Sequence, residues 1–83
     1  MTTVALYAGA AAAAGTDKVQ LDTSPRTIGD LEDALMALPS ADATLASTLK
    51  ACSFLVDGVA TKDRAHRITD ARTIDVLPPF AGG

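Results

Sequence analysis

The sequence has few of the side chains from which catalytic centres and covalent frameworks are built. Its 83 residues include one cysteine, Cys52, one histidine, His66, and no tryptophan. An internal disulfide needs two cysteines, and a structural zinc or iron–sulfur site needs four ligands, so both are excluded. A single thiol is typical of a reducing, cytoplasmic setting. We therefore expect no metal and no cofactor bound by this chain.

Excess positive charge and a long hydrophobic run are also missing. The net charge is −3, which is the wrong sign for a protein whose main partner is nucleic acid. No lysine or arginine precedes Lys18, so the charged region of a signal peptide is absent. The alanine-rich stretch near the start is too short to cross a membrane. These absences predict one small cytoplasmic domain with no nucleic-acid or membrane partner.

Short alternating patterns of apolar and polar residues predict β-strands. Val4 and Leu6, for example, share one face of the first pattern. Asp57-Gly58 is a dipeptide typical of a tight hairpin turn, and it leads to a further short strand at Val59. The other predicted strands span residues 3–7, 18–22, 53–56 and 72–77.

The longest helical pattern lies in the middle of the chain. Thr27 can serve as its N-cap, with Asp30 in the position of a capping box, and Pro39 ends it. Its apolar stripe is Ile28, Leu31, Ala34, Leu35 and Leu38, and its polar side is Asp30, Glu32 and Asp33. This pattern predicts an amphipathic helix that covers one face of a sheet.

Two weaker helices flank it. Residues 8–14 are nearly all alanine and precede Gly15, which can end a helix, although an alanine-rich loop is the alternative. The second weaker helix is expected to begin at the cap Ser40 and to run through Leu45 and Leu49 towards Lys50.

The order of these elements predicts an α+β fold of the ubiquitin-like β-grasp type, with a mixed sheet and the main helix on one face. Ile74, Val76 and Leu77 form a short apolar run that suits a central strand, with Ile74 and Val76 inward and Asp75 outward. Periodicity alone also allows another small α+β sandwich. The predicted domain covers residues 1–77, and residues 78–83 form an extended, flexible tail.

The sequence ends in Gly82-Gly83, and the composition of the six residues 78–83 suits an extended segment that inserts into a partner. Proline fixes φ near −65° and favours extended structure before it. Glycine has no Cβ, so it can pass through a channel too narrow for other residues. Extended, the six residues reach roughly 20 Å. We expect the carboxylate of Gly83 to reach a partner's active site.

The segment Ile74-Asp75-Val76-Leu77-Pro78-Pro79-Phe80-Ala81-Gly82-Gly83 resembles the end of the small, sulfur-carrying subunit of molybdopterin synthase, in the MoaD/ThiS superfamily. The similarity extends to the opening strand with its alanine-rich helix, to the helix 27–38 and to the run Phe54-Leu55-Val56-Asp57-Gly58. The tail is the most specific part, while the first helix lacks the charge that many relatives carry. The resemblance implies a ubiquitin-like β-grasp fold.

The resemblance also implies a carrier cycle centred on Gly83. An E1-like adenylating enzyme would use ATP to activate the terminal carboxylate. A sulfur donor, a sulfurtransferase, would convert the acyl-adenylate into a thiocarboxylate. The large catalytic subunit of molybdopterin synthase would use this sulfur for the dithiolene, in molybdenum cofactor biosynthesis. The small subunit would be a non-catalytic carrier within a heterotetramer, and ATP would bind to the activating partner.

The candidate site residues follow from this cycle. Gly83 is the adenylation and thiocarboxylate site, because an α-carboxyl with a pKa of about 3.3–3.7 is ionised and can attack the ATP α-phosphate. Leu77 and Phe80 are candidates for the partner interface, with core packing as the alternative for Leu77. The residues expected to thread the partner's channel are Pro78, Pro79, Phe80, Ala81 and Gly82.

Other interpretations remain open. A carrier for thiamine, cysteine or tRNA thiolation shares the terminal glycines, although Pro78-Pro79 favours the molybdopterin type. A ubiquitin-like modifier would join Gly83 to lysines of target proteins, and a structural domain could end in Gly-Gly by accident.

Three further features have alternative interpretations. Cys52 is either a persulfide relay or, as is commoner, a small buried thiol. His66 lies in a charged loop and is typical of a solvated surface residue. The basic residues Lys62, Arg64, Arg67 and Arg72 form either a docking patch for an acidic partner or RNA, or a solvated face.

Overall fold

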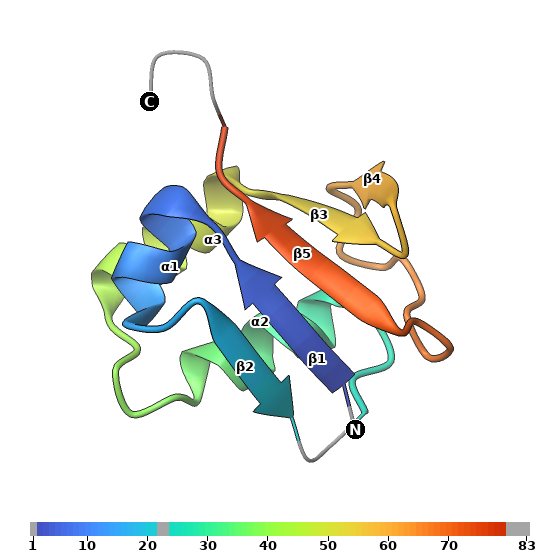
Figure 1. Cartoon of the computed structure of the whole chain (residues 1–83), viewed down its shortest axis with the longest axis horizontal. Coiled ribbons are helices and arrows are strands. Elements are labelled where there is room, and N and C mark those ends of the chain that lie inside the picture. The colour runs from blue at the N-terminus through green and yellow to red at the C-terminus, as the bar shows by residue number, and fades with distance from the viewer. Residues whose placement is uncertain (1, 22–23, 80–83) are drawn as a thin grey trace.

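The computed structural model describes residues 2–21 and 24–79, and these residues form a five-stranded sheet with three helices (Figure 1). Asp22 and the tail residues Phe80, Ala81, Gly82 and Gly83 lie outside the described residues. The elements are β1 Thr2–Leu6, α1 Ala8–Ala14, β2 Lys18–Leu21, α2 Ile28–Met36, α3 Ala43–Ala51, β3 Ser53–Val56, β4 Val59–Thr61 and β5 Thr73–Leu77.

The sheet is mixed, and β5 lies in its middle. The strand order is β2-β1-β5-β3-β4, with β5 parallel to β1 and antiparallel to β3. The register pairs Val4 with Ile74 and Leu6 with Val76, so apolar side chains line up across the strands. The predicted central place of the last strand and the α+β class are both confirmed.

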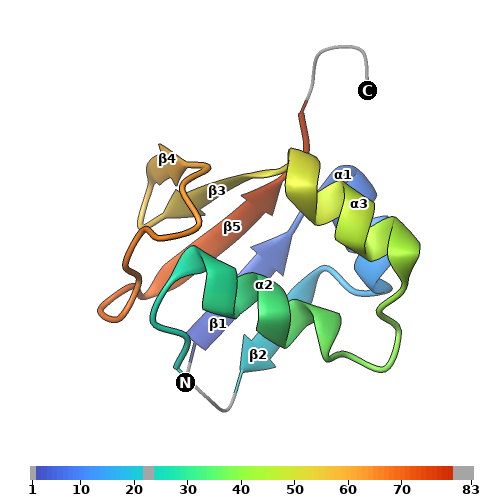
Figure 2. The ribbon, with the colours of Figure 1, turned by 180° about the vertical axis from the view of Figure 1, so that it is seen from behind.

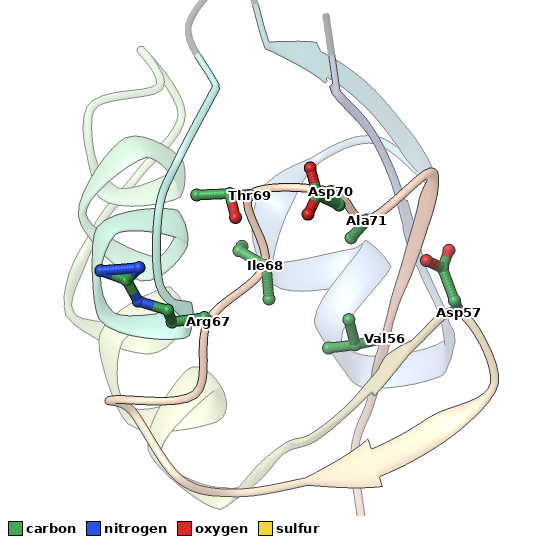
Figure 3. Close-up of a pocket in the computed structure, with 7 residues that line it drawn as sticks. All are labelled: Val56, Asp57, Arg67, Ile68, Thr69, Asp70 and Ala71. Atoms are coloured by element: carbon green, nitrogen blue, oxygen red, sulfur yellow. The ribbon is translucent and has the colours of Figure 1, made fainter.

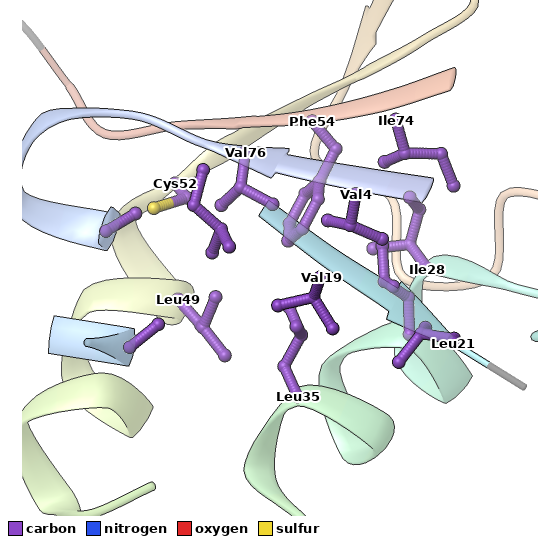
Figure 4. Close-up of a cluster of buried hydrophobic side chains, with 14 of the residues drawn as sticks. Val4, Val19, Leu21, Ile28, Leu35, Leu49, Cys52, Phe54, Ile74 and Val76 are labelled. Carbon is purple, nitrogen blue, oxygen red and sulfur yellow. The ribbon is translucent and has the colours of Figure 1, made fainter. Parts of the chain in front are cut away.

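The core lies between one face of the sheet and the helices (Figure 4). Burial alternates along β1 and β5, as the sequence pattern predicts, with Val4, Ile74 and Val76 almost fully buried. Figure 4 shows these side chains directed from the sheet towards Leu35 and Leu49 on the helices. Seen from behind, α2 and α3 lie across this face (Figure 2). Figure 1 shows the opposite face, where no described helix lies across the strands and α1 lies beside the end of β1.

Helix α2 begins as the sequence predicts. The Oγ1 of Thr27 accepts a hydrogen bond from the Asp30 amide, and Asp30 Oδ2 accepts one from the Arg26 amide. The Ile28 and Gly29 amides donate to the carbonyls of His66 and Arg64, so the loop before β5 satisfies the first turn of the helix.

The Glu32 side chain of α2 lies on the buried face of the helix and not on the predicted polar face. Glu32 was expected on the polar side, but it is buried and lies on the same stripe as Ile28 and Leu35. Its Oε1 lies 2.7 Å from Nε of Arg64, whose side chain is largely exposed. Position 32 follows Ile28 by four residues, so helical geometry requires this placement. The helix also ends at Met36, with Leu38 only partly buried.

Helix α3 begins later than expected, and the predicted cap has another role. Asp42, not Ser40, caps α3 by accepting a hydrogen bond from the Leu45 amide at 3.0 Å. The Ser40 hydroxyl instead donates to the Ala14 carbonyl at 2.6 Å, at the end of α1. The predicted C-cap of α1 is confirmed, because Gly15 has a φ of 77° and its amide donates to the Ala11 carbonyl.

The β3–β4 hairpin has the predicted turn. Asp57 and Gly58 have φ values of 48° and 89°, the left-handed pair that favours this dipeptide. The Asp57 carboxylate accepts hydrogen bonds from the amides of Arg72 and Thr73, which ties the turn to the start of β5.

No helix within residues 2–21 and 24–79 is long and apolar enough to cross a membrane.

Candidate functional site

The predicted tail begins where β5 leaves the sheet, beside the end of β1 (Figure 1). The Tyr7 amide donates a hydrogen bond to the Val76 carbonyl at 3.2 Å, and Leu77 pairs with Ser53 on β3. Pro78 is half-buried and Pro79 is exposed. The base of the tail is thus held by strands on both sides, while the chain turns outward at the two prolines.

Of the predicted site residues, the structure describes Leu77, Pro78 and Pro79, which are consecutive at this base. Leu77 is half-buried and lies on the opposite side of β5 from Val76, so it belongs to the helix-free face and not to the core. This placement is consistent with the interface hypothesis for Leu77. The roles proposed for Phe80, Ala81, Gly82 and Gly83 concern residues outside the described part of the chain.

The helix-free face next to Leu77 carries both apolar and charged side chains, since Ala5 on β1 lies between Lys18 on β2 and Asp75 on β5. Strand register places Ala5, Asp75 and Leu55 side by side across β1, β5 and β3, and all three are half-buried. Tyr7 is 46% exposed and its hydroxyl donates to Asp75 Oδ1 at 3.3 Å. Tyr7, Asp75 and Leu77 therefore form a connected surface at the tail base.

Sequence reasoning did not propose Tyr7 or Asp75 as site residues. Asp75 was correctly expected to point away from the core. The alternation that places Leu77 on the outer face of β5 places Asp75 there too, two residues earlier. Tyr7 is the large aromatic that follows β1, and only the pairing of β1 with β5 brings it to this position.

The charge of Asp75 acts on its neighbour. It raises the pKa of the Tyr7 hydroxyl above the ordinary value of 10.0, with smaller contributions from burial and from their hydrogen bond. Within residues 2–21 and 24–79, no lysine or arginine lies within ion-pair distance of Asp75. Asp75 thus presents a negative charge on this face with a tyrosine hydroxyl as its hydrogen-bond donor.

Cys52 has the environment of a structural thiol. It is buried at the junction of α3 and β3, and burial together with the charge of Glu32 raises its pKa, while Lys62 lowers it. A buried thiol with a raised pKa is a poor nucleophile, which favours the structural interpretation over a persulfide relay. In the described part of the chain, no three His, Cys, Asp or Glu side chains are grouped to hold a metal.

One side chain of the basic cluster has an acidic partner. The Arg64 guanidinium lies against Glu32, and the backbone amide of Arg72 bonds to Asp57. His66 is half-buried and contributes its carbonyl to the start of α2. These contacts give the loop a structural role, and the docking-patch interpretation stays a prediction.

A pocket of about 450 Å³ lies at the other end of β5 (Figure 3). Val56, Ile68 and Ala71 supply its apolar side chains, and Asp57, Arg67, Thr69 and Asp70 complete the lining. Because residues 67–71 precede β5 while the tail follows it, this pocket is separated from the tail base by the length of the strand.

The fold and this site define the class of the protein. A mixed sheet with the last strand in its middle, a helix across one face and a tail that leaves the central strand make up a ubiquitin-like β-grasp protein. A family model described as the ThiS family matches residues 4–83. The chain therefore belongs to the ThiS family of ubiquitin-like sulfur carriers, whose members work with E1-like activating enzymes.

Two solved structures from Haloferax volcanii resemble this fold. SAMP1 is 24% identical, with a TM-score of 0.73, and the match covers 99% of this chain and 98% of that one. A structure of small archaeal modifier protein 1 is 25% identical, with a TM-score of 0.71 and coverage of 95% and 97%. A comparison with curated protein sequences found no match.

Proposed function

We propose that this chain is the sulfur-carrier subunit of molybdopterin synthase, and that Gly83 carries the sulfur as a thiocarboxylate. The observation that carries this proposal is the Pro-Pro–Gly-Gly tail on a central strand whose end is held by β1 and β3. Membership of the ThiS family supports the carrier role, and the Pro78-Pro79 pair favours the molybdopterin pathway.

The chemistry takes place at one carboxylate. An oxygen of Gly83 attacks the α-phosphorus of ATP, which releases pyrophosphate and forms an acyl-adenylate. A sulfur nucleophile from the donor attacks the carbonyl carbon and displaces AMP. Thiols of the donor then reduce the S–S bond that joins the transferred sulfur to the donor, and a thiocarboxylate remains on Gly83. Transfer of this sulfur to the pterin precursor on the large subunit regenerates the carboxylate after hydrolysis.

The carrier needs no catalytic side chain in this scheme, because every catalytic group belongs to a partner. The partners are the E1-like adenylating enzyme, a sulfurtransferase as sulfur donor and the large catalytic subunit, which forms a heterotetramer with this chain in the cytoplasm. ATP binds to the adenylating enzyme and not to this chain.

The tail composition fits insertion into a narrow channel. Ordering a flexible backbone costs about 1–2 kcal/mol per residue. Pro78 and Pro79 have restricted backbones before docking, so they reduce this cost. Gly82 and Gly83 have no such restriction, and a channel that excludes any Cβ explains why glycine is used there.

The second candidate function is protein modification, in which Gly83 forms an isopeptide bond with a lysine. It is favoured by the resemblance to small archaeal modifier protein 1, whose name describes a modifier. Intact-mass analysis of cell lysate separates the two functions: a modifier gives a ladder of higher-mass adducts, and a sulfur carrier gives only the small mass change of a thiocarboxylate.

The main experiment is a pull-down with the full chain, followed by intact-mass analysis. Recovery of a pterin-synthase large subunit together with thiocarboxylated Gly83 supports the proposal. Recovery of a thiazole synthase instead would assign the chain to a related carrier pathway. A chain that stays unmodified with ATP and the adenylating enzyme from the same source would contradict both carrier functions.

A second experiment tests the channel. Gly82→Ala is expected to abolish ATP–pyrophosphate exchange by the adenylating enzyme while leaving the melting temperature unchanged, because its methyl group meets the channel wall. Gly9→Ala is the matched control, since a Cβ there meets no atom within 4 Å. Normal exchange by the Gly82 variant would show that the channel does not exclude a side chain.

A further inference from the structure

We propose that Ala8 is a positioning residue for the carrier reaction: its constrained backbone fixes the base of the tail, so that residues 78–83 leave the domain in one direction. This inference rests on the proposed function, since it concerns how Gly83 is delivered to the adenylating enzyme. It assigns a role in the reaction to a residue of α1, far from Gly83 in the sequence.

The backbone at Ala8 is in a conformation that alanine rarely adopts. Its φ is 51°, in the small left-handed region where Cβ crowds the backbone. Among the described residues other than glycine, only Asp57 also has a positive φ, and its Asp-Gly turn explains that value. No turn chemistry explains Ala8, because glycine and asparagine are the residues that suit this conformation. Strained backbone of this kind persists where the surrounding contacts require it, and it is concentrated at functional sites.

The contacts on either side of Ala8 require this conformation. The Tyr7 amide donates to the Val76 carbonyl at 3.2 Å, which joins Tyr7 to the end of β5. The Tyr7 carbonyl accepts from the Ala10 amide at 3.0 Å, which joins Tyr7 to the first turn of α1. Ala10 is fully buried, so the helix cannot move outward to relieve the turn. Tyr7 therefore ties α1 to the tail base, and Ala8 is the residue at which the chain turns between them (Figure 1).

The tail base needs a fixed direction because the tail is long. Six extended residues span roughly 20 Å, so a change of about 15° in direction at Leu77 moves the end of the tail by about 5 Å. Reaction requires the attacking oxygen to lie about 3–3.5 Å from its target atom. The Tyr7 amide holds the β1 side of the tail base, and the pairing of Leu77 with Ser53 holds the β3 side. A looser Tyr7 would therefore let the tail leave in several directions.

Alanine limits the motion of this turn in a way that glycine would not. Alanine with a positive φ is confined to a small region of φ and ψ, whereas glycine reaches most of the map. Glycine would fit a φ of 51° with less strain, yet the chain places its glycine at the next position, Gly9, where φ is not positive. The strained alanine thus lowers stability but keeps the range of φ narrow.

The experiment compares Ala8→Gly with Ala12→Gly, which makes the same change at an exposed position of α1. Ala8→Gly should melt no lower than the unmodified chain, since glycine is unstrained at this φ, whereas Ala12→Gly should melt lower, since glycine weakens a helix interior. In ATP–pyrophosphate exchange by the adenylating enzyme from the same source, kcat/KM of the carrier should fall about tenfold for Ala8→Gly and stay unchanged for Ala12→Gly.

Further measurements separate positioning from a general structural effect. In the isolated chain, the NMR order parameter of the Leu77 amide, the last one before the two prolines, should fall from about 0.85 to about 0.7 for Ala8→Gly and stay unchanged for Ala12→Gly. Ala8→Asn should keep both the order parameter and the exchange at the level of the unmodified chain, because asparagine tolerates a positive φ but retains a Cβ.

Docking is tested with shortened chains that end at Pro79. The unmodified sequence and the Ala8→Gly variant in this form should compete equally for the enzyme, because neither has a tail to direct. Unequal competition would overturn the inference by assigning Ala8 to docking.

The remaining outcomes are distinct. An unchanged kcat/KM for Ala8→Gly would overturn this inference and leave the proposed function standing. Equal losses for Ala8→Gly and Ala12→Gly would also overturn it, because α1 would then act through its helix stability. An unchanged order parameter of Leu77 in the Ala8→Gly variant would overturn it in the isolated chain, without any enzyme. No exchange with the unmodified chain would overturn the proposed function, and this inference with it.

Discussion

Tyr7 is the only tyrosine of the chain, so its ionisation can be followed directly by near-ultraviolet absorbance. We predict a titration midpoint above 10.0, because the charge of Asp75 opposes formation of the phenolate. Asp75→Asn removes that charge and should bring the midpoint back towards 10.0. The measurement tests the Tyr7–Asp75 contact in the isolated chain, without any partner.

Asp33→Asn is the control for this titration, since it removes an exposed charge on α2 and should leave the midpoint of Tyr7 where it was. Equal midpoints for the unmodified chain and the Asp75 variant would show that the two side chains do not interact in solution.

The lowered pKa of Asp57 makes the stability of the fold depend on pH. Hydrogen bonds from the amides of Thr73 and Arg72 lower the pKa of its carboxyl below the ordinary 3.8. A lowered folded-state pKa contributes stability that is present above 3.8 and is lost as the pH falls through the folded value. Asp57→Asn keeps a carbonyl acceptor and tolerates the left-handed backbone, so it isolates the charge.

We therefore expect Asp57→Asn to melt below the unmodified chain near pH 7, with the gap narrowing as the pH falls below 3.8 through the folded-state pKa of Asp57. Thermal melts near pH 7 and at the lowest pH at which the chain stays folded check this. A gap of equal size at both would mean that the amide geometry, and not the charge of Asp57, stabilises the turn. Asp57→Ala should keep part of its gap in acid, because alanine is strained at a φ of 48°.

Single residues also show where the sequence was insufficient. The Thr27 cap is local, so the sequence pattern predicts it correctly, although Asp30 accepts from the Arg26 amide and not from that of Thr27. Ser40 is different, because its hydroxyl bonds to Ala14, 26 residues earlier, and no local pattern contains that contact. Glu32 could have been assigned to the buried stripe by its spacing from Ile28, but its type favoured the polar side.

At the scale of elements, the strands were predicted well because their signal is strong. One face of β1 and of β5 is buried against helices, so their residues alternate in polarity. The sharp entry into α1 was not predicted. Ala8 has a φ of 51°, which alanine rarely adopts, and nothing in an alanine-rich run indicates which residue will take it.

Helix α1 offers a matched pair of glycine substitutions. Gly9 lies inside the helix with open space around its Cα, so Gly9→Ala should stabilise the protein by about 0.5–1 kcal/mol. Gly15 ends the helix at a φ of 77°, so Gly15→Ala should destabilise it by about 1 kcal/mol, because alanine is strained there. Denaturant unfolding of both variants measures these changes.

The two substitutions should change the free energy of unfolding in opposite directions, although each adds one methyl group to the same short helix. If both destabilise the protein, α1 contributes through packing of its backbone against α3 rather than through its own helix stability. If neither substitution changes the free energy of unfolding, α1 is not formed as a stable helix in the folded protein.

At the scale of the molecule, the two ends of β5 have different structural surroundings. The end before Thr73 carries the pocket and the loop that holds the start of α2. The end after Val76 carries the tail base, beside which the Tyr7 amide bonds to the Val76 carbonyl and the Tyr7 hydroxyl bonds to Asp75. The central strand and the tail after it were predicted from the sequence, but the contact between Tyr7 and Asp75 depends on the pairing of β1 with β5, which no local pattern contains.

This division predicts that stability and function separate cleanly at Pro79. All buried core residues described lie between Thr2 and Val76, so a chain that ends at Pro79 should melt within about 2 °C of the full sequence. It should still compete with the full chain for the adenylating enzyme, because it retains the folded domain and the tail base, yet it should support no pyrophosphate exchange. A large fall in melting temperature would show that residues 80–83 contribute to the fold. Folded protein that fails to compete would place the binding energy in the tail, whereas exchange by the shortened chain would remove Gly83 from the reaction.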